Sequence, residues 1–85
     1  MKNRYEYLLK GFEDILSGSS IKDDWVFVIN ESNGEAYNKY SKEKQSFRGV
    51  TIMFINDLML PDETILYGLN PYVKGAEVIL YSKFI

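Results

Sequence analysis

Three pairs of adjacent acidic residues are the side chains in this sequence best suited to chemistry. The pairs are Glu13-Asp14, Asp23-Asp24 and Asp62-Glu63. Two neighbouring carboxylates can exchange protons with a substrate or bind a divalent cation. Each pair, however, falls at the expected end of a helix or at a turn, where carboxylates cap backbone N–H groups and stay solvated. We therefore expect these pairs to be structural, with no catalytic and no metal-binding role.

Nucleophilic catalysis lacks its usual side chains in this sequence. The 85 residues include no histidine and no cysteine, which removes the commonest general base, the thiol nucleophile and disulfides. Lysine is the remaining base for a serine, but Lys83 directly follows Ser82 in an expected strand, so their side chains point to opposite faces. The glycines are isolated and form no phosphate-binding loop. The sequence therefore predicts a protein that is not an enzyme and uses no cofactor.

The composition indicates one small globular domain. The chain is 46% hydrophobic and 26% charged, which is typical of a folded protein, and its length suits a single domain over residues 1–85. It begins with no apolar leader and contains no run of about 20 apolar residues that could cross a membrane. We therefore expect a cytoplasmic protein without membrane contact. The many Lys, Asn, Ile and Tyr residues favour a low-GC bacterium or its phage as the source.

The spacing of apolar residues predicts a helix over residues 3–17. Six apolar side chains recur at steps of three and four, as they do along one stripe of an amphipathic helix: Tyr5, Leu8, Leu9, Phe12, Ile15 and Leu16. Asn3 is suited to cap the start of this helix, and Gly18 is suited to end it.

A β-hairpin is expected directly after this helix. Residues 25–29 are aromatic or β-branched throughout, as is typical of strands. Asn33-Gly34 follows them and is the dipeptide that most strongly indicates a two-residue type I′ turn. With this turn, Phe27 would lie opposite Tyr40, and these two rings would form the centre of the core together with Trp25.

The second half of the sequence predicts three further strands. Residues 41–46 are polar and without periodicity, so we expect an exposed loop there. Residues 50–55 form the next strand, and residues 63–68 and 77–82 share a composition that indicates a second hairpin. Residues 58–60 are compatible with strand or loop. The fold class that follows is α+β, with one N-terminal helix packed on an antiparallel sheet of four to five strands.

Two of these strands are apolar on both faces. They are the strand around Met53 and the strand around Ile79 and Leu80, and the sequence ends on the apolar pair Phe84-Ile85. A single helix covers one face of such a sheet, so either the sheet closes on itself or another chain covers the second face. We therefore expect a homo-oligomer.

Four side chains outside the expected core are candidates for partner recognition. They are Tyr37, Phe47, Arg48 and Tyr72, and the two tyrosines are expected to be solvent-exposed. Tyrosine and arginine are among the side chains that most often anchor protein interfaces. We therefore expect a small non-enzymatic protein-binding module, such as an inhibitor from a phage or mobile element that occupies a surface of a host protein.

Two other functions remain open. The aromatic content of 15% suits an oligomer that binds a small ligand or nucleotide in a pocket between chains. The segment 39–48 combines basic and aromatic side chains and is suited to weak binding of single-stranded nucleic acid. The net charge of −2 makes nucleic acid the less favoured partner, because phosphate binding depends on positive charge.

Overall fold

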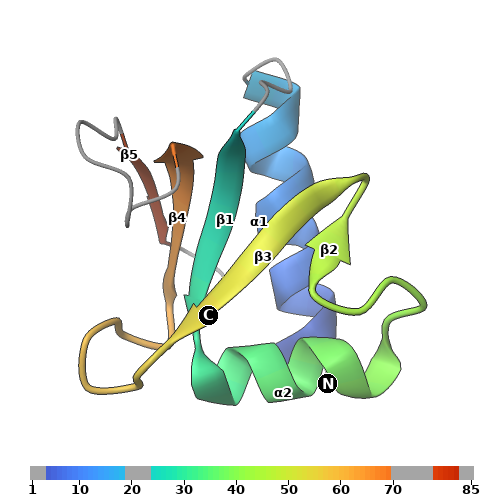
Figure 1. Cartoon of the computed structure of the whole chain (residues 1–85), viewed down its shortest axis with the longest axis vertical. Helices are drawn as coiled ribbons and strands as arrows, with labels where there is room; N and C mark the ends of the chain where they lie inside the picture. The colour runs from blue at the N-terminus through green and yellow to red at the C-terminus, as the bar shows by residue number, and fades with distance from the viewer. Residues whose placement is uncertain (1–3, 19–23, 70–77, 83–85) are drawn as a thin grey trace.

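The computed structural model describes residues 4–18, 24–69 and 78–82. Within them, two helices and five strands form an α+β architecture with a mixed sheet of strand order β2-β3-β1-β4-β5 (Figure 1). The elements in chain order are α1 (Arg4–Gly18), β1 (Trp25–Asn30), α2 (Glu31–Tyr40), β2 (Ser46–Phe47), β3 (Val50–Ile55), β4 (Thr64–Leu69) and β5 (Val78–Ser82). Neither described helix has the length and apolar character needed to cross a bilayer.

The two central strands, β1 and β3, run parallel, with Phe27 opposite Ile52. The other neighbouring strands pair antiparallel. A parallel pair cannot be joined by a tight turn and needs a crossover connection, and α2 lies in that connection. The prediction of one helix and a purely antiparallel sheet is therefore wrong, because residues 31–40 form a helix and not the second strand of a hairpin.

Asn30 and Gly34 explain why α2 forms where a turn was expected. Asn30 has an extended backbone, and its side chain accepts a hydrogen bond from the N–H of Asn33, so it caps the helix. Gly34 faces β3, where an added Cβ would lie 2.5 Å from a ring carbon of Phe54. The Asn-Gly pair therefore serves helix capping and close helix packing, and not a change of chain direction.

A two-residue hairpin is present further along the chain, between β2 and β3. Phe47 pairs with Val50, and the two residues between them both have positive φ, 51° at Arg48 and 81° at Gly49. Positive φ at both central positions is what a type I′ hairpin turn requires. This hairpin was not predicted, whereas the predicted hairpin of residues 63–68 and 77–82 is confirmed, since β4 pairs antiparallel with β5.

The main core joins both helices to one face of the sheet, and α1 lies behind β1 and β3 in Figure 1. The ring of Phe27 lies 4.5 Å from that of Phe12 and 4.9 Å from that of Tyr67. Trp25 and Phe27 share this face, as expected. Tyr40 is 54% exposed, so its predicted place at the centre of the core is wrong. Its position at the end of α2 turns the ring toward the surface.

The opposite face of the sheet carries a smaller apolar cluster. Val26, Val28 and Leu60 are buried in it, and Met53, Ile55 and Leu66 pack against it. Neither described helix contributes to this cluster. Residues 58–60 belong to a turn and not to a strand. The expected covering of this face by another chain stays a prediction, and Phe84-Ile85 lies outside the described residues.

Candidate functional site

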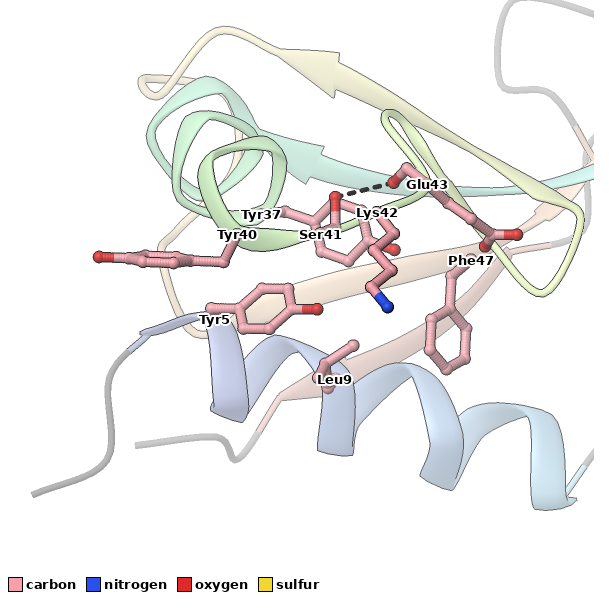
Figure 2. A pocket seen from close by; sticks show the side chains of 8 residues that line it. All are labelled: Tyr5, Leu9, Tyr37, Tyr40, Ser41, Lys42, Glu43 and Phe47. Carbon is pink, nitrogen blue, oxygen red and sulfur yellow. Dashed lines mark hydrogen bonds between the residues drawn. The ribbon is translucent and has the colours of Figure 1, made fainter.

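A hollow of about 310 Å³ opens between α1 and the C-terminal end of α2 (Figure 2). Its volume lies at the small end of the roughly 300–1,000 Å³ that is typical of ligand pockets. We call it the aromatic hollow, because four of its eight lining side chains are aromatic: Tyr5, Leu9, Tyr37, Tyr40, Ser41, Lys42, Glu43 and Phe47.

The four rings are graded from a buried floor to an exposed rim. Tyr37 and Phe47 are 2% and 8% exposed and form the floor, whereas Tyr40 is 54% exposed. Tyr5 lies between them, with its ring centre 5.7 Å from those of both Tyr37 and Tyr40. Figure 2 shows Tyr40 at the outer edge of the hollow. Leu9 projects from α1 into the hollow, toward the loop that carries Lys42 and Glu43. The arrangement offers apolar surface at a site that stays accessible.

The loop over the hollow is tied to the end of α2 by hydrogen bonds. The N–H of Ser41 donates to the carbonyl of Tyr37 at 2.9 Å, and the Ser41 hydroxyl donates to the carbonyl of Glu43 at 2.8 Å. Lys44 Nζ donates to the carbonyl of Ser41 at 2.6 Å. The hydroxyl of Tyr37 donates to the carbonyl of Ser46. These bonds fix the rim and the floor relative to one another.

Burial raises the pKa of Tyr37 to about 12, with smaller contributions from the neighbouring Tyr5 and Glu43. The phenol is therefore neutral at physiological pH and acts as a hydrogen-bond donor, and it cannot serve as a general base. Within the described residues, no group of three acidic side chains is arranged to hold a metal ion. The chemistry that the hollow supports is recognition of an apolar group.

Two basic side chains, Lys42 and Lys39, and one acidic side chain, Glu43, lie at the opening. Lys42 reaches over the hollow, with its amine pointing toward the space between Tyr5 and Phe47 (Figure 2). The amine of Lys39 lies 5.5 Å from the centre of the Tyr40 ring, a cation–π distance. The rim therefore favours an apolar ligand group that is accompanied by negative charge.

The structure brings two of the four predicted interaction residues together in the hollow. Tyr37 and Phe47 both line it, but the expectation that Tyr37 is exposed is wrong, because α2 turns this ring into the core. Arg48 is exposed outside the hollow, where its Nη2 lies 3.0 Å from Glu13 Oε2. Tyr72 lies outside the described residues.

Sequence reasoning missed Tyr5 and Tyr40 as site residues. The apolar pattern predicts that Tyr5 lies on the buried stripe of the helix and that Tyr40 lies in the core. Such a pattern does not distinguish a ring at the edge of the core from a ring at its centre. Tyrosine in place of leucine at the end of an apolar stripe is a usable signal, because its ring packs against apolar groups while its hydroxyl reaches water.

The basic segment 39–48, considered above for nucleic-acid binding, has fewer aromatic rings free to stack on bases than its sequence indicates. Phe47 is buried against the Phe12 ring, 5.4 Å away, so it cannot stack on a base. Members of two of the acidic pairs have basic partners: Asp14 lies 3.6 Å from Lys10, and Asp62 lies 3.5 Å from Arg4.

Comparison of the chain with protein-family models, with curated proteins and with solved structures gives no match.

Proposed function

We propose that this protein is a small protein-binding module that takes an apolar side chain of its partner into the aromatic hollow. The observation that supports the proposal is the exposed ring of Tyr40 at the edge of a hollow with a buried aromatic floor. A large apolar ring that stays in contact with water in the free protein is a source of binding energy when a partner covers it.

The hollow also has the features of an interface anchor site. Its floor is fixed by core packing and by the Tyr37 hydroxyl on the Ser46 carbonyl, so little conformational entropy is lost when a ligand enters. Its centre is apolar and its rim is charged, with Lys42 and Glu43 at the opening. Protein interfaces share this pattern of an apolar centre and a polar rim.

The narrower form of the proposal is a cytoplasmic inhibitor, of phage or mobile-element origin, that acts by occupying a surface of a host protein. The composition supports this form, through the absence of cysteine and the excess of residues with AT-rich codons. The sequence also has no histidine to activate a nucleophile and no cysteine. These absences favour recognition of a partner over catalysis as the function.

Saturation-transfer NMR with blocked amino acids tests the proposal without a known partner. N-acetyl-leucinamide and N-acetyl-methioninamide are expected to bind with millimolar dissociation constants, because small ligands of this size gain only about 0.3 kcal/mol or somewhat more per heavy atom. N-acetyl-glycinamide has no side chain to enter the hollow and is expected to give no transfer.

The matched variants are Tyr40→Ala, at the rim of the hollow, and Thr51→Ala, at an exposed position of β3 outside it. Tyr40→Ala should reduce the transfer to the leucine and methionine amides severalfold, whereas Thr51→Ala should leave it unchanged. Equal transfer to all three amides, or no effect of Tyr40→Ala, would contradict the proposal.

A further inference from the structure

We propose that a second copy of this chain supplies the side chain that enters the aromatic hollow, through the turn between β3 and β4. This inference rests on the proposed function and names its partner. The turn covers residues 56–63 and is called the apolar turn, because Leu58 and Met59 at its tip are 95% and 74% exposed. Together with Tyr40, they are the large apolar side chains left exposed in the part of the chain that the structure describes.

The backbone of the apolar turn is held by hydrogen bonds within the turn and to the start of α2. Asn56 Oδ1 accepts a hydrogen bond from the N–H of Leu58 at 2.7 Å, and the Asn56 carbonyl accepts one from the N–H of Met59 at 2.9 Å. Asp57 Oδ1 accepts from the N–H of Ser32 at 3.0 Å, which ties the turn to the start of α2. A loop that is already ordered loses little entropy when it docks.

The charges of the turn and of the hollow are opposite. Residues 56–63 include three acidic side chains and no basic one, whereas the segment 39–48, which contributes part of the lining of the hollow and extends past it to Arg48, includes four basic side chains and one acidic. Arg4, which pairs with Asp62 of the turn, and Glu13, which pairs with Arg48 of the basic segment, each reduce the imbalance by one charge without reversing it. Opposite charges of this kind favour the encounter and fix its orientation.

The turn and the hollow lie at opposite ends of α2, as Figure 1 shows for the two loops. The helix has ten residues and is therefore about 15 Å long, which keeps the turn away from the hollow of its own copy. Two copies with antiparallel α2 helices would place each turn beside the hollow of the other copy. The same contact then forms twice and closes the dimer.

The exposed face of α2 suits this antiparallel arrangement. Glu31 and Glu35 are exposed in its N-terminal half, and Lys39 is exposed in its C-terminal half. In an antiparallel pair, the acidic half of each helix lies beside the basic half of the other. The helix face is therefore complementary to itself in the orientation that the turn and the hollow require.

Sedimentation equilibrium of the full chain tests the inference. Between about 0.01 and 1 mM, a range that covers weak and transient association, the mass of the wild type should rise from 9.9 kDa toward that of a dimer. The turn variant Leu58→Ser/Met59→Ser and the hollow variant Tyr40→Ala/Lys42→Glu should each weaken association at least tenfold. All four side chains are exposed, so both variants should keep the melting temperature of the wild type.

An equimolar mixture of the two variants gives the sharper result. The intact turn of the hollow variant and the intact hollow of the turn variant can form one contact, whereas neither variant can form one with itself. The mixture should therefore associate more strongly than either variant alone, and high salt should weaken it.

A wild type that stays at 9.9 kDa throughout, or a mixture no stronger than its components, would overturn the inference. Association that persists in both variants would assign the dimer to another surface, such as the β1–β3 face around Val26 and Met53, and would overturn it as well. The amide-binding assay is independent of these results. Amide binding by a monomeric chain would remove the second copy as the partner and leave the proposed function standing, whereas failure of both assays would remove both.

Discussion

The side chain of Asn30 accepts a 2.8 Å hydrogen bond from the backbone N–H of Asn33, at the point where β1 ends and α2 begins. The same Asn30 amide donates to the carbonyl of Leu60, at 3.1 Å, and to Asp62 Oδ1. One fully buried side chain thus caps the helix and anchors the turn between β3 and β4. The two elements that frame the proposed binding surfaces depend on it.

Replacing Asn30 by alanine should lower the free energy of unfolding by about 2–3 kcal/mol. The change removes a helix cap, worth about 1 kcal/mol, and leaves the buried carbonyl of Leu60 without its donor. Urea unfolding followed by circular dichroism measures the loss. Ser32→Ala is the control. Ser32 lies in the first turn of α2, is exposed, and donates a hydrogen bond from its hydroxyl to the Asp57 carboxylate. A loss no larger for Asn30→Ala than for Ser32→Ala would contradict the role of Asn30.

Gly34→Ala should destabilise the protein by about 1–3 kcal/mol, although alanine is the better helix former. The added Cβ would lie 2.5 Å from the Phe54 ring, so α2 or the ring must move. Gly18→Ala is the matched control, because a Cβ there meets nothing within 4 Å. Thermal unfolding compares the two. A double variant with Phe54→Ala should show a smaller cost for Gly34→Ala than the wild-type background, and equal costs would show that the contact does not limit the helix.

Asn30 and Gly34 also show which parts of this fold the sequence predicts and which parts it does not. The periodicity of residues 5–16 and the β-branched runs of β1, β3 and β4 predict those elements, because burial of one face leaves a local pattern. Asn33-Gly34 has a strong local preference for a turn, yet its conformation depends on Asn30 and on Phe54, which is 20 positions away from Gly34. Local propensity cannot report a contact at that distance.

The candidate site was predictable to the same limited extent. The sequence analysis selected Tyr37 and Phe47 as aromatic side chains outside the expected core, but it expected Tyr37 to be exposed, whereas its ring is buried. Once residues 31–40 are helical, Tyr37 and Tyr40 project from the end of α2 toward α1, where Tyr5 meets both rings. The hollow arises from the crossing of two helices, and the second helix was not predicted.

The pH dependence of stability should reveal the buried phenol of Tyr37. Its pKa is about 12 in the folded protein and about 10 in the unfolded chain, so the unfolded chain releases the proton first as the pH rises. The stabilisation from this group is therefore complete below pH 10 and is lost between about pH 10 and 12. The melting temperature of the wild type should fall relative to that of Tyr37→Phe over this interval, because phenylalanine has no proton to release. A constant difference between the two would contradict the assignment.

Arg48 occupies a left-handed backbone conformation, with φ of 51°, that asparagine adopts at lower cost. In a Glu13→Gln background, which removes the exposed ion pair with Arg48, Arg48→Asn should raise the free energy of unfolding by about 0.5–1 kcal/mol. Chemical denaturation measures the gain. In the wild-type background the gain should be smaller by the small contribution of that ion pair. A loss of stability in the Glu13→Gln background would show that any relief of backbone strain is smaller than the contact of the Arg48 guanidinium with the Phe47 ring, 5.2 Å from its centre.

The central claim is that the aromatic hollow receives an apolar side chain, and intermolecular NOEs test it most directly. Labelled protein is mixed with unlabelled N-acetyl-methioninamide, and the NOEs from the methionine methyl group are recorded. The account predicts contacts to ring protons of Tyr5 and Tyr40, at the opening of the hollow. Contacts instead to Met53 and Ile55, on the opposite face of the sheet, would contradict it.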